Sequence, residues 1–198
     1  MSTSATPTLT PAYLESEFAR AKSYADHVAM GNPSQQEAWK RIHEQASLTD
    51  QQTEMLGGFV REMKVLVLSG VWCGDCAQQV PFVDLIHRAA AEGTVDVRYG
   101  DRDEHAELMK FVTINQGARV PVAIFMAEDF ERCSLFGDRT LTRYRAMAER
   151  TLGAACMVPG APLPDDEVAG TLAEWVNEFE RVQLMLRLSG RLRQKHGD

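Results

Sequence analysis

Cysteines and long hydrophobic runs are both scarce in this sequence. Its 198 residues include four cysteines, fewer than a disulfide-stapled secreted scaffold of this length would use. No run approaches the roughly 18 consecutive apolar residues typical of a transmembrane helix, so we expect no membrane contact. Basic side chains are in deficit as well, 21 against 28 acidic ones, and phosphate binding needs a basic surface. The composition therefore argues against nucleic acid as a partner.

The N-terminal segment lacks the features of a targeting sequence. Met1 to Pro11 carries no basic side chain and no apolar stretch, so it fits neither a secretory signal nor a mitochondrial transit peptide. We therefore expect a disordered tail on a cytoplasmic protein. Hydrophobic residues make up 44% of the whole chain, which is enough for a core and excludes a chain that is disordered throughout.

The spacing of apolar residues and the positions of turn residues predict a succession of helices and strands. Helices are expected over 12–29, 34–46, 50–63, 77–92, 104–111, 140–152 and 168–186, and strands over 64–69, 94–99, 120–126 and 132–136. The second helix would start with a capping box of Ser34 and Glu37. The strand–helix–strand order implies parallel strands joined by a crossover, and the later strand pair implies an antiparallel hairpin. We therefore predict an α/β fold with a mixed sheet and helices on its faces.

Two of the four cysteines, Cys73 and Cys76, lie between a predicted buried strand and a predicted helix. Cys73 would then sit at the start of the helix, where unpaired backbone N–H groups and the helix dipole favour a thiolate. Cys76 lies one turn along and can donate a hydrogen bond to it. This arrangement favours redox chemistry.

The same pair can instead form half of a zinc site, which needs two further ligands. Cys133 and Cys156 are single and widely spaced, and the five histidines show no metal-binding spacing. We therefore predict no metal site and no bound cofactor. Cys133 and Cys156 are expected to be small buried hydrophobic residues, and most of the histidines are expected to lie on the surfaces of helices.

Residues 72–76, with the sequence WCGDC, follow the predicted buried strand. This segment resembles the WCxxC active-site loop of the thioredoxin family. Further along the chain, Val120-Pro121 resembles the family's loop whose cis proline faces the cysteines. Pro81 and Gly137 match the family's helix-kinking proline and the glycine at the end of its last strand.

This resemblance implies a thioredoxin-like mixed β-sheet flanked by helices, with extra N-terminal helices and a C-terminal helix. It covers residues 49–153, which we take as a thioredoxin-like domain. Residues 1–48 would form an N-terminal tail and helical extension, and residues 154–198 a linker and an amphipathic C-terminal helix. In that helix Trp175 and Phe179 belong to an apolar stripe, for which packing on the core and a homodimer interface both remain open.

The resemblance also implies the chemistry of a thiol–disulfide oxidoreductase. Cys73 would attack a protein disulfide and form a mixed disulfide, which Cys76 would then resolve. The residues expected to contact the substrate are Trp72, Gly74, Asp75, Val120 and Pro121. The partners would be disulfide-containing proteins, with a reductase or a low-molecular-weight thiol as electron donor.

Two departures from the family pattern concern charge. Asp75 stands where the family usually has a proline, and we hypothesise that its negative charge disfavours the Cys73 thiolate and makes the protein more reducing. The strand over 65–68 is wholly apolar, so the buried carboxylate common in thioredoxins is absent. Water, or a carboxylate from elsewhere such as Asp75, would then have to carry the proton of Cys76.

Two other functions remain open from the sequence. The fold can serve as a non-catalytic protein-binding module that uses the Val120-Pro121 groove or the helical extensions, with vestigial cysteines. It can also serve as a glutathione-type thiol transferase, which acts on mixed disulfides of small thiols. The intact cysteine pair, with Trp72 before it, favours the oxidoreductase.

Overall fold

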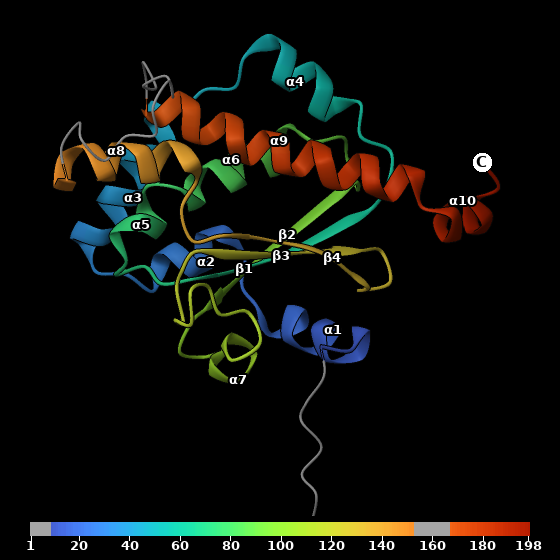
Figure 1. Cartoon of the computed structure of the whole chain (residues 1–198), viewed down its shortest axis with the longest axis horizontal. Helices are drawn as coiled ribbons and strands as arrows, with labels where there is room; N and C mark the ends of the chain where they lie inside the picture. Colours follow the sequence, from blue (N-terminus) through green and yellow to red (C-terminus); the bar gives the residue numbers. More distant parts are fainter. Residues whose placement is uncertain (1–8, 153–166) are drawn as a thin grey trace, which may run out of the picture.

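The fold is built on a four-stranded mixed sheet (Figure 1). The computed structural model describes residues 9–152 and 167–198. The strands are β1 (Met63–Ser69), β2 (Val95–Asp101), β3 (Val122–Ala127) and β4 (Arg132–Gly137), in the order β2-β1-β3-β4. β1 runs parallel to β2 and antiparallel to β3, and β4 runs antiparallel to β3. The sheet and its flanking helices confirm the predicted α/β fold.

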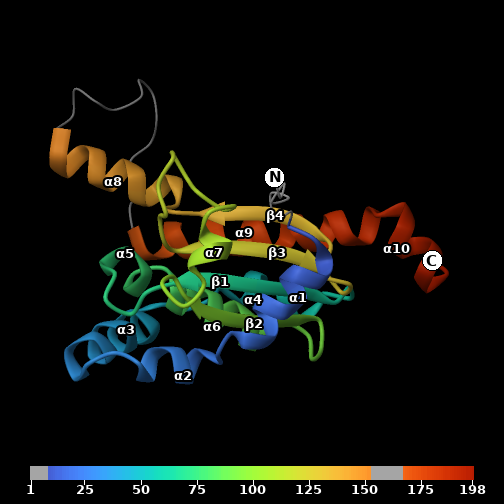
Figure 2. The same ribbon diagram turned by 90° about the horizontal axis from the view of Figure 1, so that it is seen from below.

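Helices cover both faces of the sheet (Figures 1 and 2). Their bounds are α1 (Pro11–Arg20), α2 (Tyr24–Ala29), α3 (Pro33–Gln45), α4 (Asp50–Gly57), α5 (Gly74–Ala77), α6 (Val80–Ala89), α7 (Ala106–Met109), α8 (Leu141–Leu152), α9 (Glu167–Leu188) and α10 (Gly190–His196). α6 and α9 pack against each other on one face, and α1 and α7 lie on the opposite face. α2 packs on β2 and α3 packs on α6, so the N-terminal helices surround one edge of the sheet.

The central strands are buried on both faces, which explains their nearly continuous apolar sequences. Every residue of β3 is buried, and in β1 Lys64 alone is half-buried. Val65 pairs with Val97 on one side and with Phe125 on the other, so β-branched and aromatic side chains meet across the sheet. β4 lies at the edge of the sheet and is only partly buried.

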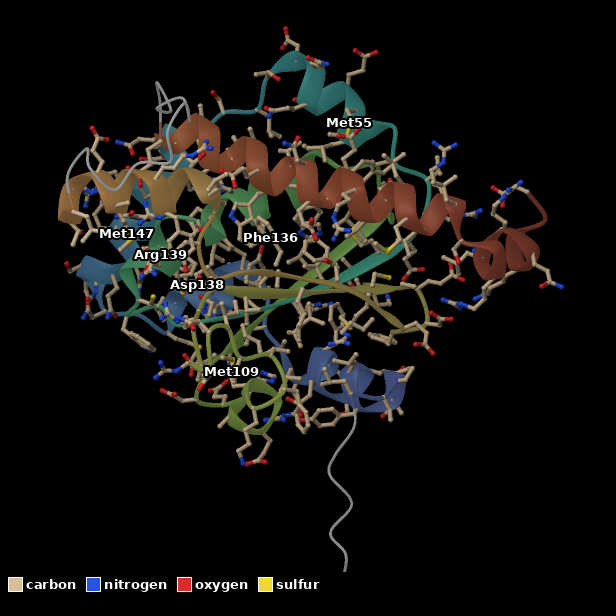
Figure 3. All side chains as sticks on the ribbon, viewed as in Figure 1. Met55, Met109, Phe136, Asp138, Arg139 and Met147 are labelled. Carbon is tan, nitrogen blue, oxygen red and sulfur yellow. The ribbon has the colours of Figure 1, made fainter. Side chains whose placement is uncertain are left out.

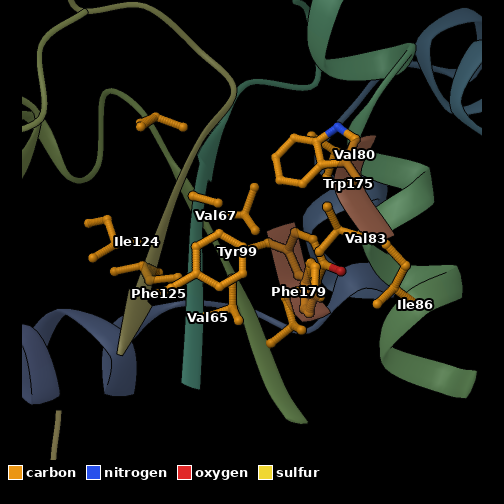
Figure 4. Close-up of a cluster of buried hydrophobic side chains, with 14 of the residues drawn as sticks. Val65, Val67, Val80, Val83, Ile86, Tyr99, Ile124, Phe125, Trp175 and Phe179 are labelled. Atoms are coloured by element: carbon orange, nitrogen blue, oxygen red, sulfur yellow. The ribbon is translucent and has the colours of Figure 1, made fainter. Parts of the chain in front are cut away.

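The core lies between the sheet, α6 and α9 (Figure 4). Trp175 and Phe179 of α9 are fully buried. The Phe179 ring lies 5.0 Å from that of Phe125, and the Trp175 ring lies 4.7 Å from that of Phe136, both edge to face. The apolar stripe of the C-terminal helix is therefore core packing on this chain's own sheet.

The N-terminal segment expected as one helix over 12–29 forms two, α1 and α2. Between them Lys22 forms a β-bridge with Tyr99, in which each backbone N–H donates to the other's carbonyl at 2.9 Å. Ser23 then caps α2, because its side chain accepts from the Asp26 N–H. The helical spacing of apolar residues continues across the break, so the periodicity does not reveal it.

Helix α3 begins earlier than predicted. Its capping box is made by Asn32 and Gln35, whose side chains each accept from the other's backbone N–H. Pro33 is the first helical residue, a position where its missing N–H costs nothing. The predicted box of Ser34 and Glu37 is therefore wrong, because the proline moves the cap to the residue before it.

Three other helix boundaries differ from the predictions. The helix predicted over 77–92 is the shorter α6, which follows the separate short helix α5 and has Pro81 in its first turn, where no N–H is needed. α4 ends at Gly57 rather than near residue 63. A further helix, α10, follows α9 because Ser189 caps it by accepting from the Leu192 N–H.

His27 and His105 are exceptions to the expectation that most histidines lie on helix surfaces, because both are buried. The Nδ1 atom of His105 lies 2.6 Å from Oε2 of Glu17, which ties the start of α7 to α1. The His27 ring lies among the rings of Trp39 and Tyr99. Their burial depends on contacts with residues distant in the sequence, which local spacing does not show.

Some predictions lie outside the described residues. These are the N-terminal tail up to residue 8, the linker up to residue 166, and Cys156. Within the two described segments, no helix combines the length and the apolar character that a membrane span requires.

Candidate active site

The candidate site lies where β1 ends and α5 begins. β1 ends at Ser69, the chain turns at Gly70, and Cys73 is the N-cap residue of α5. The Cys73 N–H donates to the Gly70 carbonyl at 2.9 Å, and the Ala77 N–H donates to the Cys73 carbonyl at 3.0 Å. The structure thus places Cys73 at a helix start, as the sequence predicts, beside the free N–H groups of the first turn.

The two cysteines differ in exposure. Cys76 is fully buried, whereas Cys73 is partly exposed. They approach within 3.5 Å of each other, and neither is in a disulfide. The pair is therefore close enough to react as a unit, with one sulfur accessible from outside.

The Cys73 thiol is acidic. A hydrogen bond from the Cys76 thiol lowers the pKa of Cys73 most, and the N–H groups of Cys76 and Asp75 lower it further. Burial and the negative charge of Asp75 act in the opposite direction, and the resulting pKa is about 6. A thiol with this pKa is about nine-tenths ionised at pH 7 and is therefore a ready nucleophile.

The Cys76 thiol stays protonated. Burial raises the pKa of Cys76 well above its ordinary value, and the hydrogen bond and charge of Cys73 raise it further. The Ser69 hydroxyl and the Gly70 N–H lie beside it and lower its pKa to a smaller extent. The pair is therefore asymmetric, with an accessible thiolate and a buried proton donor.

The Val120-Pro121 loop faces the cysteines. Its peptide bond is cis, and Cys73 Sγ lies 3.8 Å from the Val120 carbonyl oxygen. Gly137, at the end of β4, lies directly against this loop. Its φ is +146°, and a Cβ there would meet the Pro121 carbonyl oxygen at 2.3 Å, so only glycine permits both the conformation and the approach. The structure thus brings together three segments that are far apart in the sequence.

Trp72 offers an exposed aromatic surface beside Cys73. The residue is 49% exposed, and the Arg102 guanidinium lies 4.5 Å from its ring centroid. The ring folds over Gly70, where a Cβ would lie 2.7 Å from it. Arg102 is absent from the sequence-based prediction. The sequence does contain one signal for it. Arg102 directly follows β2, and because β2 is parallel to β1, the ends of the two strands lie side by side.

Two arginines hold the Asp75 carboxylate. Its Oδ1 accepts from Arg143 Nη2 at 3.0 Å, and its Oδ2 accepts from Arg139 Nη2. Burial raises the pKa of Asp75, but the arginines outweigh burial and the net pKa is lowered. The sequence-based prediction contains neither arginine, because they lie 68 and 64 positions further along. Their position at the start of the helix over 140–152 is the one local signal.

This geometry refines two expectations about Asp75. Its charge does oppose ionisation of Cys73, as hypothesised, but it is the smallest of the contributions and the net pKa of Cys73 is lowered. Since arginines take both of its carboxylate oxygens, Asp75 is also poorly placed to carry the proton of Cys76.

A pocket of about 660 Å³ opens beside the start of α5. Gly74 and Asp75 line it, together with Arg143 and Arg150 of α8 and Glu167 of α9. A Cβ on Gly74 would meet nothing within 4 Å, so this residue borders open space. The expected substrate-contacting residues therefore lie around Cys73 on two sides, the Val120-containing loop and this pocket.

Cys133, on β4, lies apart from this site and is half-buried. Its thiol donates to the Glu131 carbonyl at 3.5 Å, and burial raises its pKa, so it has the character of a structural thiol. In the part of the chain that the structure describes, no group of three or more His, Cys, Asp or Glu side chains is arranged to hold a metal ion.

Comparison with known proteins agrees with the fold described above. A family model described as thioredoxin matches residues 21–150. One similar structure is a protein of unknown function from Pseudomonas aeruginosa, 18% identical, with a TM-score of 0.64 over 83% of this chain and 95% of that chain. Another is an HIV epitope scaffold, 17% identical, with a TM-score of 0.60 over 83% of this chain and 97% of that chain. At these identities the two structures show the fold alone. No curated protein matches the chain.

Proposed function

Because this chain belongs to the thioredoxin family, we propose that it is a thiol–disulfide oxidoreductase that reduces or exchanges protein disulfides through Cys73 and Cys76. The observation that carries the proposal is the asymmetry of the pair. Cys73 is accessible and its pKa is about 6, whereas Cys76 is buried and its pKa is raised well above its ordinary value. Nucleophilic attack and resolution need these two different thiols.

The reaction proceeds in two exchanges. The Cys73 thiolate attacks one sulfur of the substrate disulfide, forms a mixed disulfide and releases the other substrate sulfur as a thiolate. Cys76 then attacks Cys73 Sγ, the Cys73–Cys76 disulfide forms, and the second substrate sulfur leaves. The proton of Cys76 passes to the second leaving thiolate and the first takes a proton from water, so the substrate ends as two thiols. A reductase or a low-molecular-weight thiol then returns the electrons.

Substrate binding uses the surfaces on either side of Cys73. The Val120 backbone lies beside Cys73 and can pair with an extended substrate segment, while Pro121 has no N–H to pair. The half-exposed Trp72 ring offers an apolar contact. Together they favour a protein substrate whose disulfide lies in an extended or locally unfolded segment.

The test is reduction of a protein disulfide, with insulin as the probe. Cys73→Ser should abolish turnover, and Cys76→Ser should accumulate a mixed disulfide on Cys73, detected by mass spectrometry. Cys133→Ser is the matched control and should keep wild-type activity. Full activity of Cys73→Ser would disprove the assignment of the nucleophile.

The reduction potential of the pair separates the proposal from the other functions. A potential near about −270 mV supports a reductase, and one near about −120 mV supports an oxidant. No reversible couple at all would favour a protein-binding module. Preferential activity toward mixed disulfides of small thiols would favour a thiol transferase.

A further inference from the structure

An acidic residue between two reactive cysteines poses a physical problem. A carboxylate near a thiol opposes its ionisation, and Asp75 lies in the first turn of the helix that Cys73 begins. Its side chain is only 19% exposed, so solvent screens its charge weakly. A group that neutralises this charge therefore favours the Cys73 thiolate.

Asp75 meets two guanidinium groups, one on each carboxylate oxygen. We propose that Arg139 and Arg143 are positioning residues, which neutralise Asp75 and so keep Cys73 nucleophilic. This inference rests on the proposed function, because it assigns the two arginines a part in the reactivity of the same thiol. They act through Asp75 rather than by touching the reacting sulfurs.

Both arginines are held in place by further partners. Arg143 is 9% exposed, and its Nη1 donates to Glu167 of α9 at 2.6 Å. Arg139 is 19% exposed, and its guanidinium lies 3.4 Å from Asp138 and 5.7 Å from the Tyr144 ring centroid. These contacts order the guanidinium groups before any substrate binds. We call Asp75, Asp138, Arg139, Arg143 and Glu167 the ion-pair network. Figure 3 shows its members Asp138 and Arg139 at the end of the sheet beside α5 and α8.

The other carboxylates near this end of the sheet also have partners. Asp138 accepts from Tyr144 at 2.6 Å and from Arg119 at 3.1 Å. Glu167 also accepts from Arg150 at 2.9 Å. On the far side of Cys73, Arg102 pairs with Asp103 at 3.1 Å. Each of these carboxylates has a partner other than Arg139 and Arg143. Loss of either arginine would therefore leave Asp75 as the undercompensated charge next to Cys73.

The network also reaches the loop that faces the cysteines. Arg119 directly precedes Val120, and it binds the same Asp138 carboxylate as Arg139. Gln79, at the start of α6, donates to the Asp138 carbonyl at 3.0 Å. The arginines therefore belong to a set of contacts that connects the Val120-Pro121 loop with the start of α6.

The experiment measures the pKa of Cys73 from the pH dependence of its alkylation by iodoacetamide, followed by mass spectrometry. Arg143→Gln should raise this pKa by about 0.5, since Asp75 is left undercompensated, and Asp75→Asn should lower it by a similar amount. The double variant Asp75→Asn/Arg143→Gln should return toward the wild-type value. Arg139→Gln provides a second arginine variant that leaves Glu167 paired, in case Arg143→Gln does not fold.

Arg150→Gln is the matched control, because among the described residues Arg150 pairs with Glu167 rather than with Asp75. It should leave the pKa of Cys73 unchanged. A merely structural role predicts shifts of the same sign in the aspartate and arginine variants, and that result, or no shift, would overturn the inference. Alkylation reports on Cys73 without turnover. A wild-type chain that fails to reduce insulin would therefore contradict the proposed function alone.

Discussion

Two regions flank the active-site loop and hold it in different ways. On one side is the aromatic support, which we define as Tyr24, His27, Trp39 and Tyr99. It is joined to the loop by a hydrogen bond from the Trp39 indole N–H to the Val71 carbonyl, at 3.2 Å. On the other side is the ion-pair network, which contacts the loop through the hydrogen bonds of Arg139 and Arg143 to Asp75. One region contributes rings and the other contributes charges.

The difference separates stability from reactivity. In the aromatic support the Tyr24 ring lies 5.5 Å from that of Tyr99 and 6.0 Å from that of Trp39, so the region acts by packing. In the ion-pair network the groups act on the charge balance beside Cys73. Changes in the first region are expected to cost folding free energy and leave the thiol unchanged. Changes nearer the cysteines are expected to alter the pKa of Cys73.

The largest expected effect is that of Trp39→Ala. Trp39 is fully buried, and loss of such a side chain costs about 3–5 kcal/mol of unfolding free energy. Urea denaturation measures the unfolding free energy, and Trp39→Phe should lower it by less than Trp39→Ala does. The comparison predicts that the pKa of Cys73 in the folded fraction stays at its wild-type value. A shifted pKa together with unchanged stability would reverse the roles of the two regions.

The second effect is the pH dependence that His27 imposes on folding. Burial lowers the pKa of His27 from 6.5 to about 4, and within the described residues neither ring nitrogen has a hydrogen-bond partner. Between these values the unfolded chain binds more protons than the folded chain. Stability therefore falls as the pH drops from 6.5 to 4, by up to about 3 kcal/mol.

His27→Phe keeps a ring in place and should remove this contribution, as seen in the difference between urea midpoints at pH 7 and pH 4.5. His87→Phe, on the half-buried side of α6, is the control and should retain the wild-type pH dependence. Equal pH dependence in the wild type and His27→Phe would show that His27 is not buried in its neutral form.

The third effect concerns the thiol itself. Cys76→Ala removes the hydrogen bond that contributes most to the acidity of Cys73, so the pKa of Cys73 should rise by about 1. Thiolate absorbance as a function of pH measures the shift. Cys133→Ala should leave the titration unchanged. No change in Cys76→Ala would assign the acidity to the helix start rather than to the partner thiol.

The smallest effect is expected for Ser69→Ala. Ser69 is fully buried at the end of β1, and its hydroxyl is the side-chain group that lowers the pKa of Cys76. Its loss should slow resolution of a mixed disulfide on Cys73 by about two- to five-fold, because the attacking Cys76 loses a neighbouring hydroxyl that favours its thiolate. Single-turnover release of the substrate thiol measures this step. Ser134→Ala, on β4, is the control. Equal slowing in this variant would contradict a specific effect of Ser69 on Cys76.

Much of the framework could be predicted from local sequence. The apolar strand over 64–69 and the cysteine pair after it predict β1 and the helix start at Cys73, because burial on both faces leaves a continuous apolar run. The break at Lys22 could not be predicted, because it depends on a β-bridge to Tyr99, far along the chain. The capping box at Asn32 could have been predicted from the sequence, because a proline at the first helical position is a local signal.

The sequence by itself determined which apolar segments form strands, the position of Cys73 before a helix, and the presence of Asp75 between the cysteines. These features follow from the periodicity of apolar residues and from neighbouring residues. Only the tertiary structure decided what Asp75 does. Its partners, Arg139 and Arg143, come from the chain after β4, 64 and 68 positions away, and α8, which carries Arg143, is held in place by packing on α9. Charge pairing depends on distance in space, and that distance is settled by the packing of the helices.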